Sequence, residues 1–436
     1  RDHVLSIPSV LIKENDLIFT QNEEISVVSA VQSTLPNMQC LTGEDLSDSK
    51  LIFTWSDTNP NISAKIDIPD ASKSLLYLPA NIVPLGSYIF TFTASITITG
   101  VQVTNVAEFR FTVIRSPLIV SIEGGSRRAA TIKAGEIIVI DGSNSYDPDM
   151  LPITYINHLN FLWECTLYPS LNDCNIDNLS SMNVPKLSLS SSYFNESSDI
   201  NNDVYQFKLT VTAKANLTDT RSNVAIQKIA TIEQDIPKLD IKFQGASEEA
   251  INFPISKSLQ LLCRIKNYNP AQEYTYQWEE DNNLLDLTDI NILSSTPNAA
   301  ALVIKPHSLV ADMIYTFTVT VTNLNENSQA FISFTIITNA PPVGGDCDAI
   351  ATYNNETAFP EYELSCDGWS DAPGHEPFYY SFYYERKIPD DKARWNKISL
   401  KSTQNIILSE IAPNKGDDKT IRLKVDIFDR YGALTT

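Results

Sequence analysis

Short runs of alternating apolar and polar residues dominate the chain. Four of these runs carry a large aromatic residue at the same place, namely residues 51–55, 159–165, 274–278 and 378–382. Alternation with a period of two is typical of a strand that is buried on one face. The repeated aromatic predicts that each run is the central strand of a β-sandwich core.

The spacing of two aromatic positions predicts a repeat of sandwich size. Trp55, Trp163 and Trp278 are 108 and 115 residues apart, whereas Tyr88, Tyr205 and Tyr315 are 117 and 110 apart. Two independent series with nearly equal periods favour tandem copies of one fold. Each tyrosine also begins a Tyr-x-Phe strand, which predicts a corner in which its hydroxyl bonds to nearby backbone.

Proline and turn-forming residues divide the chain into four segments. The expected domains are residues 1–116, 117–236, 237–341 and 342–436, the last of them truncated at its C-terminal end. Proline supports these boundaries because it cannot donate to a strand ladder. The predicted fold class is all-β, a rod of four Greek-key β-sandwiches in tandem.

Charge and hydropathy restrict the partners. The chain has 32 basic and 53 acidic residues, so its formal net charge is −21. Nucleic acid and anionic membrane surfaces are therefore not expected to bind, because both need clustered Lys and Arg. The sequence contains no apolar run long enough to span a bilayer, and it reads as a piece of a longer protein. Any contact with a membrane is expected through parts outside this sequence.

Cysteines and glycosylation sequons indicate an oxidising, extracellular setting. We expect the disulfides Cys165–Cys174 and Cys347–Cys366, whose members are 9 and 19 residues apart. Cys40 and Cys263 are left over, either as buried free thiols or bonded to an unidentified partner. N-linked glycan is expected at some of five sequons. These begin at Asn61, Asn178, Asn195, Asn216 and Asn355.

Two stretches carry a family resemblance. Residues 339–347 read Asn-Ala-Pro-Pro-Val-Gly-Gly-Asp-Cys, and residues 364–371 read Leu-Ser-Cys-Asp-Gly-Trp-Ser-Asp. This resembles the signature of the REJ (receptor for egg jelly) module, and residues 142–149 and 161–165 are similar to the same module and to the related PKD fold. The resemblance implies fibronectin-III-like and PKD-like sandwiches in the ectodomain of a large membrane protein of the polycystin-1 type. The first segment is expected to be PKD- or fibronectin-III-like, the second REJ- or PKD-like, the third fibronectin-III-like and the fourth REJ-like.

No catalytic, cofactor or metal site is predicted. The sequence has no GxSxG, HExxH or P-loop motif, and His3, His158, His307 and His375 are interpreted as solvated loop residues. Clustered Asp residues in loops favour turns, with Ca²⁺ binding as the alternative. They are Asp147, Asp149, Asp367 and Asp371. The pair Arg127–Arg128 is interpreted as an exposed hairpin turn, alternatively a protease-sensitive or anion-binding spot.

Aromatic residues in the fourth segment are the candidates for an interface. Tyr379 and Tyr383 fall on the opposite face of their strand from Phe378, Tyr380 and Phe382. Aromatic surface of this kind indicates contact with a neighbouring domain or another protein. Trp369 in the preceding loop is the third candidate.

The expected function is extracellular recognition or adhesion. The partner would be a protein or glycan at the cell surface, reached together with neighbouring domains of the same polypeptide. The cell surface, including the ciliary membrane, is the expected location. The alternative is a structural component of a surface or ciliary, mastigoneme-like assembly. An enzyme is the third class, for which the sequence offers no catalytic residues. The ligand, the oligomeric state and the full-length architecture stay open.

Overall fold

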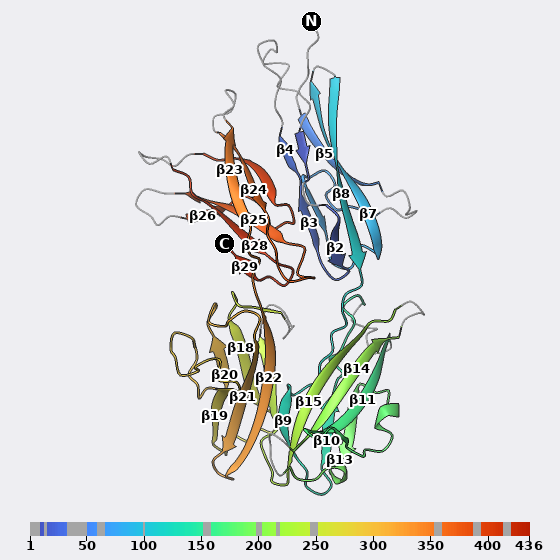
Figure 1. Cartoon of the computed structure of the whole chain (residues 1–436), viewed down its shortest axis with the longest axis vertical. Coiled ribbons are helices and arrows are strands. Elements are labelled where there is room, and N and C mark those ends of the chain that lie inside the picture. Colours follow the sequence, from blue (N-terminus) through green and yellow to red (C-terminus); the bar gives the residue numbers. More distant parts are fainter. Residues whose placement is uncertain are drawn as a thin grey trace. The chain divides into compact units, whose positions relative to one another are not determined.

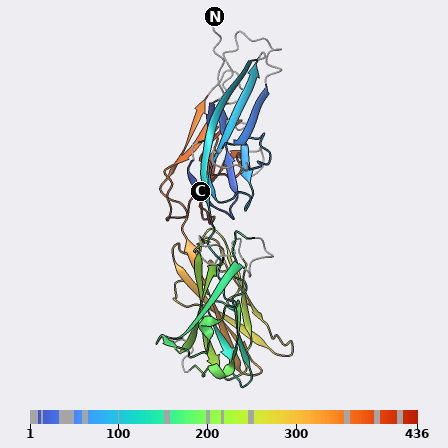
Figure 2. The ribbon, with the colours of Figure 1, turned by 90° about the vertical axis from the view of Figure 1, so that its right-hand side faces the viewer.

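The computed structural model shows an all-β chain. It describes residues 9–12, 15–32, 50–58, 66–98, 101–150, 158–197, 203–214, 219–244, 252–352, 360–386, 394–412 and 420–436. Both views show strands and connecting loops throughout (Figures 1 and 2). The described ranges contain the 3-10 turns η3 (Leu179–Ser181) and η4 (Ser191–Tyr193). None of the helices described there is long and apolar enough to cross a membrane. The predicted fold class is confirmed.

The chain divides into two compact units. The first contains Arg1–Arg115 and Pro341–Thr436, and the second contains Ser116–Ala340. The first unit therefore joins the first and last segments of the sequence, while the second joins the two middle segments. Among the residues that the structure describes, two large hydrophobic cores lie in each unit. The residue boundaries proposed for four separate domains stay a prediction.

The described residues in the N-terminal part of the first unit form eight strands. They are β1 (Ser9–Leu11), β2 (Leu17–Thr20), β3 (Ile25–Val28), β4 (Ala30–Gln32), β5 (Lys50–Asp57), β6 (Leu75–Leu78), β7 (Gly86–Ile98) and β8 (Val101–Ile114). A four-stranded sheet has the order β2-β8-β7-β5, and the pairs β3-β6 and β1-β4 form two smaller sheets. Their shared core contains Trp55, whose ring centroid lies 4.9 Å from that of Phe92 on the paired strand.

In the C-terminal part of the first unit, the residues that the structure describes form seven strands. They are β23 (Asp346–Thr352), β24 (Glu361–Asp367), β25 (Tyr379–Arg386), β26 (Arg394–Lys397), β27 (Ile406–Glu410), β28 (Leu423–Phe428) and β29 (Leu434–Thr435). They form sheets with the orders β23-β24-β27 and β26-β25-β28-β29. Phe382 is buried in this core at the position that tryptophan occupies in the other three.

The second unit is organised around one large sheet. Residues 116–236 contribute β9 (Arg127–Thr131), β10 (Ile137–Asp141), β11 (Leu159–Tyr168), β12 (Asn172–Asp173), β13 (Lys186–Ser190), β14 (Val204–Ala213) and β15 (Ser222–Ile232). Residues 237–340 contribute β16 (Leu239–Gln244), β17 (Phe253–Pro254), β18 (Leu259–Ile265), β19 (Tyr274–Glu280), β20 (Ala301–Ile304), β21 (Ile314–Asn323) and β22 (Ser328–Asn339). The large sheet has the order β12-β11-β14-β15-β9-β22-β21-β19, with β17 also on β22. The sheets β10-β13 and β16-β18-β20 supply the remaining strands.

Strand β9 joins the two sandwiches of the second unit. It pairs in parallel with β15 on one side and antiparallel with β22 on the other. A small apolar cluster of Val204, Ala230 and Phe331 lies at the same junction. The two middle segments therefore share one hydrogen-bonded sheet, which a row of separate sandwiches would not have.

The repeated aromatics lie where the sequence pattern predicts. Trp55, Trp163 and Trp278 are buried. The indole nitrogens of Trp163 and Trp278 donate to the carbonyls of Val184 and Ala299, at 2.8 and 2.9 Å. Because a buried N–H without a partner is costly, these bonds fix the orientation of each ring.

The three predicted tyrosine corners are confirmed. The hydroxyl of Tyr88 donates to the carbonyl of Pro84 at 2.7 Å. The hydroxyls of Tyr205 and Tyr315 instead accept the backbone N–H groups of Asn195 and Val310, at 2.8 and 2.9 Å. Each bond ties the start of a core strand to the segment that leads into it.

Candidate functional site

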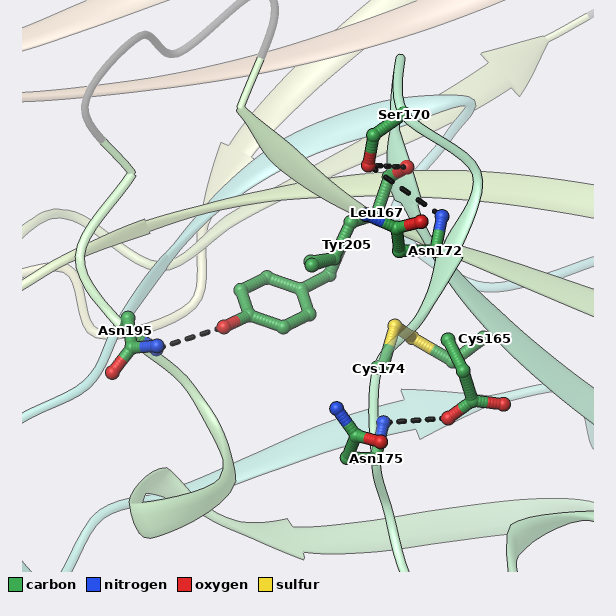
Figure 3. The surroundings of a disulfide bond; sticks show 9 residues. Cys165, Leu167, Ser170, Asn172, Cys174, Asn175, Asn195 and Tyr205 are labelled. Atoms are coloured by element: carbon green, nitrogen blue, oxygen red, sulfur yellow. Dashed lines mark hydrogen bonds between the residues drawn. A yellow bond between two sulfur atoms is a disulfide. The ribbon is translucent and has the colours of Figure 1, made fainter.

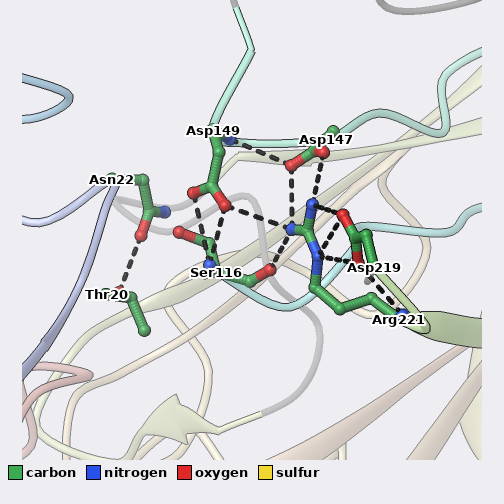
Figure 4. Close-up of polar contacts among 7 residues, drawn as sticks. All are labelled: Thr20, Asn22, Ser116, Asp147, Asp149, Asp219 and Arg221. Carbon is green, nitrogen blue, oxygen red and sulfur yellow. Dashed lines mark hydrogen bonds and ion pairs between the residues drawn. The ribbon is translucent and has the colours of Figure 1, made fainter. Parts of the chain in front are cut away.

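An arginine and three carboxylates form a buried network in the second unit. The loop after β10 supplies Asp147 and Asp149, and Arg221 directly precedes β15. The guanidinium donates to both carboxylate oxygens of Asp147 at 3.0 and 2.7 Å, to Asp149 at 3.1 Å and to Asp219 at 2.9 Å (Figure 4). It also donates to the carbonyl of Ser116 at 2.5 Å. The bidentate bond to Asp147 is the strong, planar form of an arginine–carboxylate pair.

The electrostatics of this network follow from its burial. The carboxylate side chains of Asp147, Asp149 and Asp219 are 4, 3 and 1% exposed. Burial raises the pKa of Asp149, although hydrogen bonds from Ser116 and the charge of Arg221 oppose the shift. For Arg221, burial lowers the pKa, but the hydrogen bonds that its guanidinium donates to Asp219 and Asp147 outweigh burial, so the net shift of the pKa is upward. The loop carboxylates of Asp147 and Asp149 therefore bind the guanidinium of Arg221, a cation from the same unit.

The sequence pointed to the two carboxylates of the loop but not to Arg221 or Asp219. Arg221 is 74 and 72 residues from Asp147 and Asp149. The available signal is local, since Asp219 and Arg221 are two residues apart just before a strand. That spacing lets the carboxylate accept the backbone N–H and the Nε–H of Arg221, both within 3.1 Å.

The interpretation of Arg127 and Arg128 as an exposed hairpin turn was wrong. Both residues lie at the start of β9, inside the large sheet. Arg128 donates to Gln227 at 3.0 Å and to the carbonyl of Val139 at 2.6 Å, and burial lowers its pKa to about 10. Arg127 lies over the ring of Phe331 and 3.7 Å from Asp281. Gly125 allows close approach to β22, and Gly124 lies against Arg128 and Gln227, so this stretch is not a solvent-exposed turn.

The first expected disulfide is present in the second unit. Cys165 and Cys174 are bonded, with their Cα atoms 5.6 Å apart (Figure 3). Cys165 lies on β11, and Cys174 follows the two-residue strand β12 that pairs with β11. The bond therefore holds the loop between these strands against the core.

The second expected disulfide lies in the signature region of the first unit. Cys347 and Cys366 face each other on β23 and β24 and are bonded, with a Cα separation of 4.1 Å. Val343 and Ser370 form a backbone bridge just before and after these strands, with N–O distances of 2.9 and 3.0 Å. The indole of Trp369 lies directly over Gly345, where a Cβ atom would be only 2.5 Å from the ring. The signature glycine and tryptophan thus form a structural contact, and Trp369 is half-buried.

The remaining cysteines and sequons have different outcomes. Cys263 is a buried free thiol, and burial raises its pKa to about 12, which keeps it protonated and unreactive at neutral pH. Asn178 and Asn195 are exposed, as a glycan acceptor must be. Four predicted positions lie outside the described residues. They are Cys40, Asn61, Asn216 and Asn355.

A groove of about 510 Å³ lies between the two parts of the first unit. We call it the tyrosine groove, because Tyr77 from β6 and Tyr379 from β25 contribute to its wall. Its other lining residues are charged residues of both signs, two leucines and a serine. They are Glu23, Glu24, Ser26, Leu75, Lys397, Leu400, Lys401 and Arg430.

Direct bonds connect the two walls of the tyrosine groove. The backbone carbonyl of Ser26 accepts the N–H of Thr403 at 3.0 Å, and its hydroxyl donates to the carbonyl of Lys401 at 3.1 Å. Arg430 pairs with Glu23 at 2.8 Å and donates to the carbonyl of Ile18 at 2.6 Å. The first and last segments of the chain are therefore held together by backbone and charged contacts.

The candidate interface tyrosines occupy different surroundings. Tyr379 faces the tyrosine groove with the ammonium of Lys401 4.8 Å from its ring centroid, and burial followed by the charge of Glu23 raises its pKa. Tyr383 lies further along β25, where Lys424 is 4.6 Å from its ring. Burial and the nearby carboxylate of Asp426 raise the pKa of Tyr383. A cation over a tyrosine face is favourable, so both rings are oriented by a lysine of the same unit.

The interpretation of His375 as a solvated loop residue was wrong. Its side chain is 14% exposed and its Nδ1 lies 3.4 Å from Asp371 and 3.8 Å from Asp429. Tyr431 packs edge-on against the imidazole at 5.0 Å. His307 is exposed and His158 is half-buried, while His3 lies outside the described residues. Asp367 is exposed and accepts a hydrogen bond from Asn405 at 2.9 Å.

The fold and the disulfides define this chain as a disulfide-stabilised protein of tandem β-sandwiches. Residues 38–436 match the family model of the REJ domain. The chain belongs to the REJ domain family, as the signature around Gly345, Cys347, Cys366 and Trp369 predicted.

Curated relatives with sequence similarity are much longer than this chain. Human polycystin-1 is 24% identical over 349 residues, which cover 76% of this chain and 8% of polycystin-1. Mouse polycystin family receptor for egg jelly is 27% identical over 166 residues, covering 35% of this chain and 7% of that protein. The chain thus spans less than a tenth of the length of these relatives.

Solved structures that match this chain include cadherin ectodomains. The four-domain structure of Drosophila N-cadherin EC1-4 is 9% identical, covers 84% of this chain and 92% of that chain, and has a TM-score of 0.29. Human desmocollin-1 ectodomain is 12% identical, with coverages of 98% and 78% and a TM-score of 0.19. The fold assignment rests on the sheets and cores described above.

Proposed function

We propose that this chain is part of the ectodomain of a larger polycystin-1-like cell-surface protein and serves extracellular recognition or adhesion. The observation that carries the proposal is the REJ match across residues 38–436. The relatives by sequence are polycystin-1 and a polycystin family receptor for egg jelly. Two disulfides support an oxidising compartment. We place the chain at the cell surface, with the ciliary membrane as the narrower location.

We place the contact with a protein or glycan partner at the tyrosine groove. Tyrosine rings give contact area at a low cost in side-chain entropy, and they are enriched at interfaces. The groove also offers Lys397 and Lys401 beside Glu24, so a partner would meet donors and acceptors around an aromatic wall. The role we propose for the groove is binding without catalysis, because aromatic and charged side chains of this kind are sufficient to bind a partner.

The test is a binding experiment with the secreted, disulfide-oxidised chain. Binding to cells, and to a glycan array, is measured for the wild type, for the double variant Y77A/Y379A and for Y268A. Tyr268 is 61% exposed in the second unit and serves as the matched control. We expect the groove variant to lose at least about tenfold in affinity, as for an interface hot spot, while Y268A binds like the wild type. Equal binding by all three proteins would remove the groove from the proposal.

The alternative is a structural component of a surface assembly. The continuous sheet through β9 favours it, because hydrogen bonding between the sandwiches makes the second unit suited to bearing load. Isolation of the full-length protein at physiological salt discriminates the two. Stable co-purification with partners of fixed stoichiometry supports the structural role, and isolation of the protein alone contradicts it.

A further inference from the structure

Three side chains that can bind metal meet in the first unit. Asp371 and His375 lie in the loop between β24 and β25, and Asp429 directly follows β28. One oxygen or nitrogen from each residue lies within 4.8 Å of the others. In the part of the chain that the structure describes, this is the one group of three or more His, Cys, Asp or Glu side chains with such geometry.

The group contains buried polar atoms without hydrogen bonds. The Asp371 side chain is 4% exposed, and its Oδ2 has no hydrogen-bond partner among the described residues. The Nδ1 of His375 likewise makes no hydrogen bond there and points between the two carboxylates. Buried polar atoms are normally satisfied, so atoms of this kind point to a missing ligand or ion.

We propose that Asp371, His375 and Asp429 bind one divalent transition-metal ion, with Zn²⁺ as the preferred ion. One imidazole and two carboxylates form a mixed nitrogen and oxygen set, which suits Zn²⁺ and its neighbours better than the all-oxygen set that Ca²⁺ requires. The two carboxylates also neutralise the charge of a divalent cation inside the fold.

The distances match such an ion. Two ligand atoms that each lie about 2.1 Å from a tetrahedral Zn²⁺ are about 3.4 Å apart. The Nδ1 of His375 is 3.4 Å from Oδ1 of Asp371 and 3.8 Å from Oδ2 of Asp429. Only small side-chain adjustments are therefore needed. The partial exposure of His375 leaves a way in and a fourth position for water.

The bound ion would fasten the signature loop to the end of β28. The N–H of Arg430 already donates to the carbonyl of His375 at 2.9 Å, and its guanidinium donates to the carbonyl of Gly374 at 3.3 Å. Asp429 itself is held by the N–H of Ala433, which donates to its Oδ1 at 2.7 Å. Metal binding adds a third connection between the same two segments. The inference is independent of the proposed recognition role, because it concerns the interior of one sandwich.

The experiment titrates the metal-free, disulfide-oxidised chain with Zn²⁺ in a calorimeter and with Co²⁺ in an absorption spectrometer. We expect one equivalent of Zn²⁺ to bind, to raise the melting temperature, and to displace Co²⁺ that shows a d–d absorption band. The variants D371N and H375Q should each bind Zn²⁺ at least about tenfold more weakly. Loss of a residue that only supports a metal ligand already lowers metal affinity by about tenfold or more, and loss of the ligand itself should lower it at least as much. Ca²⁺ should bind more weakly than Zn²⁺.

The control variant is H158Q, which removes a histidine from the second unit and should bind Zn²⁺ like the wild type. The test uses D371N and H375Q rather than D429N. Asp429 also accepts the N–H of Ala433, so D429N could destabilise the turn after β28 without any effect on metal binding. Circular dichroism checks that each variant is folded. The proposal fails if the wild type takes up no Zn²⁺, or if folded H375Q and D371N bind it as tightly as the wild type.

Discussion

Arg221 binds three buried carboxylates, and its removal would leave their charges uncompensated. We expect R221M to destabilise the second unit by about 3–5 kcal/mol, as for a buried ion pair that loses one partner. K208M is the matched control, since Lys208 and its partner Glu164 are 45 and 48% exposed, and it should cost less than about 1 kcal/mol. Chemical denaturation measures both.

The same variant should show a characteristic pH dependence. Burial already raises the pKa of Asp149, and loss of the Arg221 charge should raise it further. An acid with a raised pKa takes up its proton more readily in the folded state, so its unfavourable contribution disappears as the pH falls. The stability deficit of R221M should therefore be largest near neutral pH and shrink on acidification. A deficit that grows on acidification would contradict this account.

The roles of residues that pack within their own strand pattern were predictable from the sequence. The roles of residues that bind partners far away in the sequence were not. Trp163 and Tyr205 carry their signal in the alternation around them, and the structure buries both. Arg221 and His375 carry no such signal, because part of their partners lies far away in the sequence: Asp147 and Asp149 for Arg221, and Asp429 for His375. In the sequence, a buried polar residue of this kind cannot be distinguished from a solvent-exposed loop residue.

At the scale of elements, Gly345 before β23 is constrained by the ring of Trp369. A Cβ at this position would lie 2.5 Å from three atoms of the indole. We expect G345A to destabilise the first unit by about 1–3 kcal/mol, the usual cost of overpacking. The measurement is a double-mutant cycle by chemical denaturation, with G345A placed both in the wild type and in W369A.

The double-mutant cycle distinguishes a clash with the ring of Trp369 from strain in the backbone at residue 345. If Trp369 is the cause, G345A should cost little in the W369A background. A penalty of the same size in both backgrounds would assign the constraint to backbone conformation instead.

Most strands were predictable, whereas the pairing between sandwiches was not. The alternating residues 159–165 and 274–278 lie within β11 and β19. Strand β9 reads Arg-Arg-Ala-Ala-Thr, which shows no alternation of apolar and polar positions. It joins the large sheet through backbone hydrogen bonds, and these depend on the neighbouring strands rather than on side-chain pattern.

At the scale of the whole molecule, the first and last segments meet although more than 200 residues separate them in sequence. Arg430 is the main charged contact, with bonds to Glu23 and to the carbonyl of Ile18. We expect R430A to destabilise this contact by about 1.5–3 kcal/mol, as for hydrogen bonds to charged groups. Hydrogen exchange should become faster in residues 17–28 and 400–403.

R110A is the control for this prediction. Arg110 lies in the same unit but is 54% exposed and pairs with the exposed Glu108, so its loss should leave exchange unchanged. Unaltered exchange in R430A would show that the backbone bonds of Ser26 and Thr403 hold the two segments without the ion pair.

The sequence repeat predicts four copies of a sandwich but not which copies meet. Each core is specified by aromatic residues inside its own segment, so the count of copies is visible in the periods of Trp and Tyr. Contacts between segments use backbone pairing through β9 and single polar residues such as Glu23 and Arg430, and neither kind of contact has a distinctive sequence pattern. The division into two units is therefore a property of the folded chain.

The approach of Gly125 to β22 has a genetic consequence. A Cβ atom at this position would collide with the carbonyl of Ser333, and the residue has a backbone φ of +74°. Every missense change in a glycine codon adds a Cβ atom, so all such variants share one defect, whatever the chemistry of the new side chain. The pairing of the two sandwiches at β22 thus depends on the glycine codon at position 125. Natural missense alleles of this codon should all weaken that pairing.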